Sequence, residues 1–388
     1  MKINNFDYYN PTKVVFGTDI YSRTAELIKV HYTGSKVLIT YGGGSIKKNG
    51  VYDDVLAALS DFEVMEFAGI EANPEFTTLM KAVELVKKEK IGFVLAIGGG
   101  SVIDGTKFIV SAACYNGDPW DVLLRKEGYA FTEAIPFGTV LTLPATGSEM
   151  NSGAVISRSE LKEKRTMGGP FAFPKFSLLD PKVVATLPKR QIANGITDAY
   201  MHTLEQYLTF PSGNLLQERI AEGILYTLIE ISQTVLENPA DEKAAGNLMW
   251  CATMALNGTL RAGVAYDWST HMIGHELTAL FGIDHARTLA IVAPNLFTVK
   301  IDNKRDKLNQ YGQRVFGLAG DCAEEAIAKT KAFFESLGIP TRISDYTKEY
   351  QDAPEIIKSR FIERGWTAMG EKADLTPEEA KRIVQKSF

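Results

Sequence analysis

Hydrophobic residues in the first part of the chain alternate between short continuous runs and runs with helical spacing. KVLITY (36–41) and FVLAIGGG (93–100) are continuous apolar runs that end at glycines, which is typical of buried strands followed by turns. Residues 51–60 and 75–89 instead carry apolar side chains three and four positions apart, as one face of a helix does. Strand, turn, helix and strand in this order predict a parallel sheet with crossover helices.

The same alternation continues to about residue 150. VMEF (64–67) and FGTVLTLPATG (137–147) have the apolar character of further strands, the second running into a loop. Residues 101–113 are helix-like and follow the second glycine turn directly. Residues 116–135 show no regular period, and we expect a loop with short helical pieces there.

The pattern changes after about residue 180. Residues 178–191, LLDPKVVATLPKRQ, contain two prolines and are typical of a connector. Beyond them, residues 215–236 and 244–258 carry long apolar stripes at helical spacing, and the rest of the chain keeps this character. The sequence therefore predicts an α/β domain with a parallel sheet over residues 1–184 and an all-α domain over residues 185–388.

Composition narrows the classes of protein that fit. The chain has 388 residues and a net charge of 42 − 47 = −5, which argues against a nucleic-acid partner because such proteins usually carry a basic face. No apolar run approaches the roughly 20 residues that span a bilayer, so we expect no membrane partner. Cys114, Cys251 and Cys322 are scattered, and the first residues contain no apolar signal segment, which together favour a cytoplasmic protein.

Two glycine-rich turns are candidates for binding a phosphate group. YGGGS (41–45) and IGGGS (97–101) each follow an expected strand and open an expected helix. Glycines let the backbone approach a phosphate closely, and the N-terminus of a helix offers unpaired N–H donors. The spacing is not the usual G-x-G-x-x-G, so tight turns without a ligand are an alternative for each. Two such turns in one parallel-sheet domain favour a dinucleotide at the carboxyl ends of the strands.

The first turn also bears on which dinucleotide binds. An acidic residue after the second strand would hydrogen-bond a ribose 2′-hydroxyl and repel a 2′-phosphate. Here that place is held by Gly42, Gly43, Gly44 and Ser45, with two lysines shortly after. Small donors and positive charge suit a 2′-phosphate, so NADP(H) is favoured over NAD(H). The alternative is that Lys47 and Lys48 are only solvated surface residues.

Four of the five histidines gather in two parts of the helical domain. Asp198 and His202 are four residues apart, as are His271 and His275, so each pair shares one helix face. Neutral imidazoles with one carboxylate suit a divalent transition metal. A solvated ion pair or a structural histidine is the alternative for each pair, but the clustering favours a metal site.

Spacing alone does not choose the complete ligand set. His285 lies fourteen residues beyond His271, and a break near Gly282 would let a hairpin bring it back beside His271. His275 and His285 therefore both remain open as a ligand. The two-histidine spacing is also that of a metalloprotease helix, but Met272 stands where that motif has a glutamate, so the sequence fits a protease poorly.

Taken together, these motifs resemble the iron-containing (group III) alcohol dehydrogenases. Within that family the chain is most similar to the bacterial NADPH-dependent broad-range aldehyde reductases and butanol dehydrogenases. The resemblance covers nearly the whole chain, and the last two of its motifs are the most specific. The motifs are LITYGGGSIKKNG, GIEANP, AIGGGSVIDGTKFI, LTLPATGSE, GITDAYMHTLEQY and DWSTHMIGHELTALFGIDHA.

The resemblance implies a fold and a set of site residues. The fold is the dehydroquinate synthase-like architecture, in which an N-terminal dinucleotide-binding α/β domain precedes a helical metal-binding domain. The implied ligands of one divalent metal, Fe²⁺ or Zn²⁺, are Asp198, His202, His271 and His285. The implied cofactor contacts are Gly42, Gly43, Gly44, Ser45, Asn73, Gly98, Gly99, Gly100, Ser101, Asp104, Thr142, Thr146 and Lys164. Relatives that prefer NAD place an acidic residue at the position of Gly42, and a homodimer is expected.

The function expected from this resemblance is reversible hydride transfer between NADP(H) and small to medium aldehydes or alcohols, such as butanal and butanol. His275 is expected to be the catalytic residue that relays a proton or orients the substrate, although it could only orient another ligand. Asp104 could likewise be only a first-turn acid that suits the helix dipole. The alternative functions are a glycerol-dehydrogenase-like polyol oxidoreductase, an NAD-preferring alcohol dehydrogenase, and a binding protein without turnover.

Overall fold

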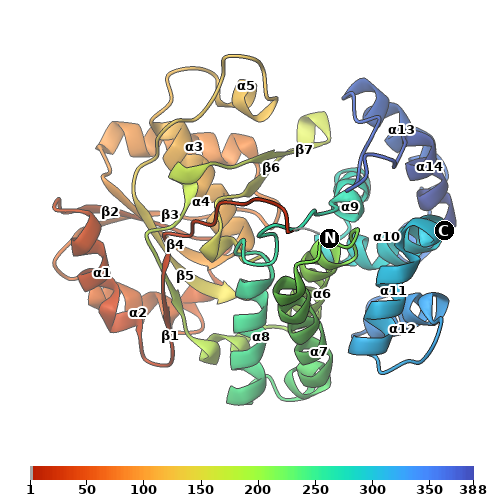
Figure 1. The fold of residues 1–388 in the computed structure, drawn as a ribbon. Helices are drawn as coiled ribbons and strands as arrows, with labels where there is room; N and C mark the ends of the chain where they lie inside the picture. The colour runs from red at the N-terminus through yellow and green to blue at the C-terminus, as the bar shows by residue number, and fades with distance from the viewer. Residues whose placement is uncertain (1–2) are drawn as a thin grey trace. The chain divides into compact units, whose positions relative to one another are not determined.

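The computed structural model describes residues 3–388, and these divide into two compact units (Figure 1). The α/β unit comprises Tyr9–Pro188 and Asn238–Met249. The helical unit comprises Lys189–Glu237 and Trp250–Phe388, together with the N-terminal segment as far as Tyr8. Each unit therefore contains a short segment that is distant in sequence from the rest of it.

The α/β unit is built on a six-stranded parallel sheet in the order β1-β8-β5-β4-β2-β3. Its strands are β1 (Lys13–Phe16), β2 (Lys36–Thr40), β3 (Glu63–Phe67), β4 (Phe93–Gly99), β5 (Phe137–Leu143) and β8 (Phe176–Leu179). An antiparallel hairpin is formed by β6 (Ala154–Arg158) and β7 (Glu163–Met167). The helices are α1 (Thr24–His31), α2 (Val51–Ala58), α3 (Phe76–Glu89), α4 (Gly100–Ala113) and α5 (Pro119–Leu123). Short 3₁₀ segments are η1 (Tyr21–Arg23), η2 (Ser45–Lys47), η3 (Ser148–Met150), η4 (Ser159–Leu161), η5 (Pro170–Ala172) and η6 (Pro181–Thr186).

The strand order explains which face of the sheet each helix covers. Crossovers between parallel strands are right-handed, so connections that run in opposite directions along the sheet lie on opposite faces. The chain moves toward the β3 edge through α1 and α2, and moves back through α3 and α4. Helices α1 and α2 accordingly lie on one face of the sheet, and α3 and α4 lie on the other (Figure 1).

The core of this unit lies around its two central strands. Nearly every residue of β4 and β5 is buried, because helices cover both faces of a parallel sheet. The rings of Phe93 and Phe176 stack with centroids 6.1 Å apart. Because the sheet is parallel, the loops after β2, β3, β4 and β5 all leave from the same edge.

A buried lysine fixes α4 against the loop that leads to the β6–β7 hairpin. The ammonium of Lys107 donates to Ser148 Oγ at 2.8 Å, to Asn151 Oδ1 at 3.0 Å and to the Gly153 carbonyl at 2.7 Å. Burial lowers the pKa of Lys107 to about 8, although the nearby charge of Asp104 opposes that change. These contacts hold the N-terminal half of α4, and thus the second glycine turn, in a fixed position.

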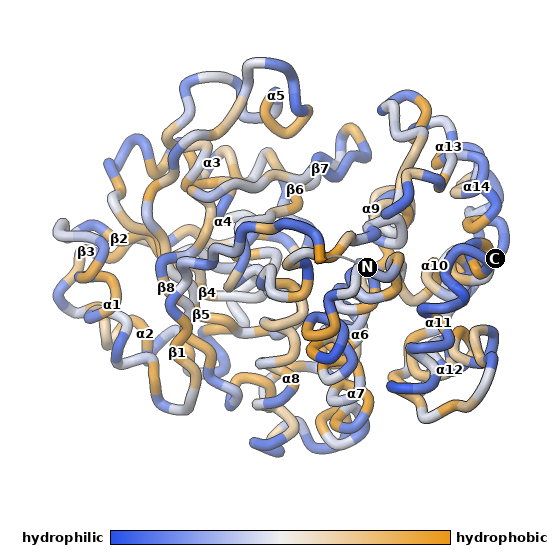
Figure 2. Tube along the Cα trace, in the orientation of Figure 1, coloured by the Kyte–Doolittle hydropathy of each residue, from blue (hydrophilic) through white to orange (hydrophobic). Residues whose placement is uncertain are grey.

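The helical unit follows the connector with few interruptions. Its helices are α6 (Lys189–Tyr207), α7 (Leu215–Glu237), α9 (Ser269–Phe281), α10 (His285–Val299), α11 (Ile301–Val315), α12 (Ala323–Ser336), α13 (Ala353–Glu363) and α14 (Pro377–Lys386), with one 3₁₀ segment, η7 (Ile343–Asp345). Helix α8 (Glu242–Ala255) begins in the α/β unit and ends in the helical unit. Figure 2 shows hydrophobic and hydrophilic residues alternating along α7, as expected for a helix with one buried face. Within residues 3–388, no helix combines the length and apolar character required to cross a membrane.

The N-terminal segment packs on the loop between α8 and α9. The hydroxyls of Tyr8 and Thr259 lie 3.3 Å apart. The Phe6 ring and the Asn4 carbonyl lie against Gly263, where a Cβ would approach them to within 3.0 and 3.1 Å. The first half of α8, in contrast, packs in the α/β unit, where Gly246 lies beside Phe16 and Pro181.

The predicted fold class, an α/β unit with a parallel sheet followed by a helical part, is confirmed. Four strands were not predicted: β1, β6, β7 and β8. Residues 178–191 are not only a connector, because they begin inside β8 and continue through η6 into α6. The expectation that both glycine turns open α-helices is wrong for the first, which leads into η2, and α2 begins only at Val51. The predicted domain boundary at residues 184 and 185 lies inside η6.

Candidate functional site

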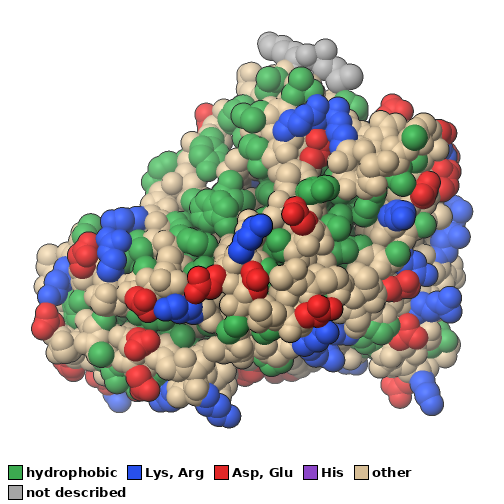
Figure 3. Space-filling model, turned by 90° about the horizontal axis from the view of Figure 1, so that it is seen from below, with side chains coloured by type: hydrophobic (Ala, Val, Ile, Leu, Met, Phe, Trp, Pro, Cys, Tyr) green, Lys and Arg blue, Asp and Glu red, His purple; other side chains and the backbone are tan. Residues whose placement is uncertain are grey.

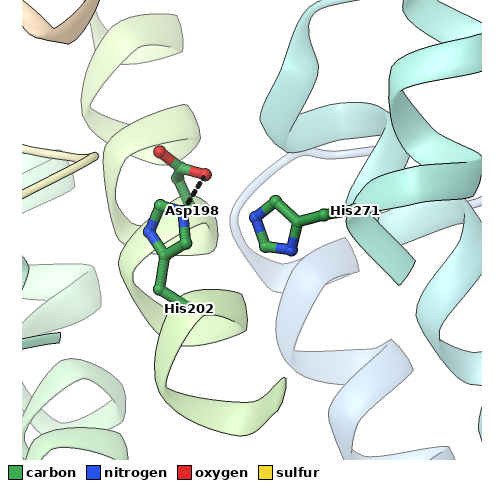
Figure 4. Close-up of side chains that lie close together, drawn as sticks. All are labelled: Asp198, His202 and His271. Carbon is green, nitrogen blue, oxygen red and sulfur yellow. Dashed lines mark ion pairs between the residues drawn. The ribbon is translucent and has the colours of Figure 1, made fainter. Parts of the chain in front are cut away.

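Two facing helices bring together three side chains of the types that bind metal ions. Asp198 and His202 lie one turn apart on α6, and His271 faces them from the first turn of α9 (Figure 4). Each residue offers one donor atom, and these three atoms lie within 4.8 Å of one another. All three residues are buried, and the His202 and His271 rings stack with centroids 4.8 Å apart.

His285 joins this group through the turn between α9 and α10. Gly282 ends α9 in the left-handed conformation, at φ 68°, which a glycine adopts without strain. The Asp284 carboxylate then accepts from Arg190 Nε at 2.9 Å and from Asn194 Nδ2 at 2.8 Å, both on α6. These bonds fix the start of α10 beside α6. The ring centroids of His285 and His271 are consequently 5.2 Å apart.

The spacing of the donors fits a bound ion. Nε2 of His202 and Nε2 of His285 each lie 3.7 Å from Asp198 Oδ1, which is too long for a hydrogen bond. Ligands held about 2.1 Å from a tetrahedral metal are about 3.4 Å from one another. Within the part of the chain that the structure describes, Asp198 Oδ1 is buried and accepts no hydrogen bond. A buried carboxylate oxygen without a donor is costly, and a cation would remove that cost.

His275 lies beside the group rather than in its centre. It follows His271 by one turn of α9 and is half-buried. Its ring centroid is 4.9 Å from that of His285 and 6.2 Å from that of His271. His275 is thus near enough to act with the group, and its predicted catalytic role stays a prediction.

Sequence reasoning missed Glu205, which contacts the candidate ligand His271. Its carboxylate is 2% exposed and makes a hydrogen bond with Nδ1 of His271. The other carboxylate oxygen accepts from the backbone N–H of Thr270 at 2.7 Å. Burial raises the pKa of Glu205 well above its usual range, and the charge of Asp267 adds to the rise. The sequence feature that could have identified Glu205 is its spacing, because residues 198, 202 and 205 follow the i, i+4, i+7 pattern of one helix face.

A buried ionic cluster lies beyond Glu205. The Lys304 ammonium on α11 contacts Asp267 Oδ2 at 3.0 Å and Glu371 Oε1 at 2.8 Å, and donates to the Leu208 carbonyl at 2.7 Å. Asp267 also accepts from the Ser269 N–H at 2.8 Å, which fixes the start of α9. Burial alone would lower the pKa of Lys304, but the charges of Asp267 and Glu371 outweigh burial, so the pKa is raised.

In the α/β unit, the second glycine turn is close-packed. Helix α4 begins at Gly100, and a Cβ at this position would approach Thr146 Oγ1 to 2.4 Å. Protein packing alone therefore requires glycine at Gly100. Thr142 lies near the end of β5 and Thr146 in the loop that follows it, so the predicted contacts from these strands share one edge of the sheet.

Several predicted cofactor contacts converge on the loop before α3. Nζ of Lys164, on β7, donates to Asn73 Oδ1 at 3.0 Å. The hydroxyl of Ser101, in the first turn of α4, donates to the Ala72 carbonyl. The structure thus brings Asn73, Ser101 and Lys164 together, although they come from three separate segments.

Asp104 points into the unit rather than away from it. Its two carboxylate oxygens accept from Ser148 Oγ at 2.6 Å and from the Val155 N–H at 2.9 Å. Burial raises its pKa, and the charge of Lys107 opposes the rise. These bonds give Asp104 a structural role, and its contact with a cofactor remains a prediction.

The first glycine turn is more open than the second. A Cβ added at Gly43 would meet no atom within 4 Å, so packing does not explain glycine there. Lys47 is not simply solvated, because its ammonium lies 2.9 Å from Glu66 Oε2 and 4.4 Å from the centre of the Tyr52 ring. Burial alone would raise the pKa of Glu66, but hydrogen bonds from Tyr52, Tyr41 and Lys47 outweigh it and lower the pKa to about 2.

Replacing His271 by Ala should remove the metal, because three of the four candidate donors would remain and one face of the ion would be open. We expect the metal content of the purified variant, measured by elemental analysis, to fall to a small fraction of that of the unchanged protein. His31→Ala is the matched control, since His31 is exposed on α1, far from this group in sequence. Full metal occupancy in His271→Ala would remove His271 from the ligand set.

Comparisons with known proteins identify the family of the chain. The iron-containing alcohol dehydrogenase family matches residues 11–181, and the C-terminal domain of the Fe-containing alcohol dehydrogenase family matches residues 192–387. The chain is 50% identical to the NADPH-dependent aldehyde reductase YqhD of Escherichia coli, over 99% of each chain. It is 43% identical to the probable NADH-dependent butanol dehydrogenase 1 of Bacillus subtilis, over 89% of this chain and 90% of that protein. The crystal structure of Escherichia coli YqhD superposes with a TM-score of 0.96 at 48% identity, covering both chains completely. The chain belongs to the iron-containing alcohol dehydrogenase family.

Proposed function

We propose that this protein is a metal-dependent, NADP(H)-linked alcohol dehydrogenase that reduces small to medium aldehydes, such as butanal, and oxidises the corresponding alcohols. The buried donor group of Asp198, His202 and His271 carries the proposal, because its chemistry and spacing suit one catalytic divalent ion. The 50% identity to an NADPH-dependent aldehyde reductase supports the choice of reaction and cofactor.

Four side chains would bind the metal, and a fifth would transfer a proton. Asp198, His202, His271 and His285 would hold Fe²⁺ or Zn²⁺, both of which accept imidazole and carboxylate ligands. When bound, the divalent metal supplies a Lewis acid for the substrate oxygen, and the reduced nicotinamide supplies the hydride. One carboxylate and neutral imidazoles would leave net positive charge where the four side chains converge, which favours negative charge in their vicinity. His275 would supply the proton that the substrate oxygen takes up.

The dinucleotide would be bound by the loops at the carboxyl edge of the sheet. The open backbone at Gly43 suits close approach of a phosphate, and the first turn of α4 presents N–H donors at Gly100 and Ser101. The linked side chains of Asn73 and Lys164 add an amide and a positive charge on the same edge. The remaining predicted contacts, Gly42, Gly44, Ser45, Gly98, Gly99, Asp104, Thr142 and Thr146, lie in or beside the same loops.

The side chains around the imidazoles favour an apolar substrate. The Trp268 ring lies 5.1 Å from the His271 ring, and Trp268 and Met272 are both half-buried. A site for polyols would present several charged or hydroxyl groups instead. This supports aldehydes with short alkyl chains over glycerol.

A second candidate is the same reaction with NADH. It is favoured by the names of relatives at 43% and 39% identity, which are NADH-dependent butanol dehydrogenases of Bacillus subtilis and Clostridium acetobutylicum. It is also favoured by the Lys47–Glu66 ion pair, which partly neutralises the positive charge expected to attract a 2′-phosphate. Gly42 stands where relatives that prefer NAD have an acidic residue, and the lack of a negative charge there argues for NADPH.

We further propose a cytoplasmic homodimer. All three cysteines are free, as is usual in a reducing compartment. On the face shown in Figure 3, hydrophobic side chains gather between interspersed acidic and basic ones. Independently of that view, Leu215 and Leu216 of α7 are 62% and 66% exposed. Exposed apolar side chains of this kind suit a contact between subunits.

The proposed activity is tested by following oxidation of NADPH and of NADH, by absorbance, with a panel that contains butanal, shorter and longer aldehydes, and the aldehyde of glycerol. The protein is loaded with Fe²⁺ or with Zn²⁺ in separate samples. We expect turnover of the alkyl aldehydes with NADPH, and its loss when a chelator removes the metal. Absence of turnover in both metal-loaded samples would overturn the proposal.

Replacing Gly42 by Asp should shift the cofactor preference from NADPH to NADH, because a carboxylate at this position repels a 2′-phosphate and accepts a bond from a 2′-hydroxyl. We expect the ratio of kcat/KM for NADPH to that for NADH to fall at least tenfold, about 1.4 kcal/mol. Gly42→Ala is the matched control, because its Cβ meets the Ile70 carbonyl at the same 3.1 Å without adding charge. An unchanged ratio in Gly42→Asp would mean that the phosphate is read elsewhere.

Replacing His275 by Ala should lower kcat about a hundredfold, the usual contribution of a positioned general acid. The metal content should stay unchanged, because Asp198, His202, His271 and His285 are all retained. Steady-state kinetics and elemental analysis of the same preparation separate the two effects. Loss of the metal from this variant would instead make His275 a ligand.

A further inference from the structure

The hydrogen bonds of Glu205 connect the two helices that carry the donor group. Glu205 lies on α6, seven residues after Asp198, and its carboxylate bonds to Nδ1 of His271 and to the backbone N–H of Thr270 on α9. The backbone carbonyl of Glu205 also accepts from the Asp267 N–H at 2.9 Å. One residue of α6 therefore fixes both the backbone at the start of α9 and the ring of a candidate ligand.

We propose that Glu205 is a positioning residue for the metal, which fixes the His271 ring with a proton on Nδ1 and with Nε2 as the metal donor. The inference rests on the proposed metal site. In its ionised form the Glu205 carboxylate has no hydrogens, so at Nδ1 it can only accept, and the ring then carries its single proton on that atom. Burial opposes this form, and the charge of a divalent ion on Nε2 would favour it. The remaining nitrogen, Nε2, keeps the lone pair that a metal requires.

The surroundings of Glu205 favour this role over that of an ordinary buried acid. Both of its oxygens are used, one by the Thr270 N–H and the other by His271, so the side chain cannot rotate without losing a bond. The carboxylate is 2% exposed, and water does not compete for either bond. The Lys304 ammonium holds the adjoining Asp267, which in turn fixes the start of α9 through Ser269.

Glutamine is the informative replacement for Glu205. It has the same shape, but it carries one acceptor and one amide donor in place of two acceptors. If the oxygen keeps the Thr270 N–H, the amide donor faces Nδ1, and the ring proton is driven to Nε2, where it blocks the metal. If the amide turns the other way, its N–H₂ meets the Thr270 N–H. Either orientation weakens the site without creating a cavity.

The test is titration of metal-stripped, full-length protein with Co²⁺, followed by the visible absorption of the bound ion and by competition with a chelator. We expect Glu205→Gln to weaken Co²⁺ binding by 10- to 100-fold, as is typical when the partner of a ligating histidine is lost. The absorption spectrum should also change, because the His271 ring is no longer held. A carboxylate that only stabilises the fold would change the unfolding midpoint and leave both readouts as they were.

Glu276→Gln is the matched control. Glu276 is a buried carboxylate on α9, five residues after His271, but it pairs with Arg360 at 2.8 Å and with Arg364. We expect this variant to lose stability and to keep the Co²⁺ affinity and spectrum of the unchanged protein. Glu205→Asp keeps the carboxylate but is one methylene shorter, and its affinity should lie between those of the unchanged protein and Glu205→Gln.

The outcomes separate the inference from the proposal on which it rests. Failure of the unchanged protein to bind Co²⁺ would overturn the metal site itself. Tight Co²⁺ binding by the unchanged protein together with equal binding by Glu205→Gln would overturn the role of Glu205 alone. If Glu205→Gln does not fold, equal affinity in Glu205→Asp and the unchanged protein would overturn it as well.

Discussion

The helical unit is organised by the need to pair the acidic groups that it buries. Asp198, Glu205 and Asp267 are each 5% exposed or less, and an isolated carboxylate at such a depth is strongly disfavoured. Asp267 is paired with Lys304, and Glu205 is bonded to His271 and a backbone N–H. Asp198 is the exception, because its Oδ1 faces imidazole nitrogens at 3.7 Å rather than a cation or a hydrogen-bond donor. A bound divalent ion would give the Asp198 carboxylate the positive partner that Asp267 has in Lys304.

Much of this arrangement could be predicted from local spacing. The i, i+4 relation of Asp198 and His202 and the break at Gly282 depend only on helix geometry, and both are present in the structure. The mutual approach of α6, α9 and α10 depends on long-range contacts such as those of Asp284 with Arg190 and Asn194, which no local pattern indicates. The role of Glu205 depends on the same kind of contact: its helix spacing places it on the face of Asp198 and His202, but its bonds to Thr270 and His271 come from α9.

The α/β unit was predicted well where strands are long and apolar, and less well elsewhere. Strands β4 and β5 have seven residues each and are almost entirely buried, so their sequences are unmistakable. Strands β1 and β8 have only four residues, and β7 is a polar strand of a hairpin that lies outside the main sheet. The glycine turns show a further limit. The two turns look alike in sequence, but packing against Thr146 explains Gly100, whereas no contact among residues 3–388 requires glycine at Gly43.

The exchange of short segments between the units has a consequence for how the chain reaches its folded state. Residues 3–8 precede all the other described residues in synthesis, but they dock on the α8–α9 loop, some 250 residues later in the chain. The α/β unit likewise takes in Asn238–Met249, which emerge after the first helices of the helical unit. Domains usually fold one after another during synthesis. Here neither unit is complete until part of the other has been made, so their folding is tied together in time, and a gene cut at the connector would encode two incomplete halves.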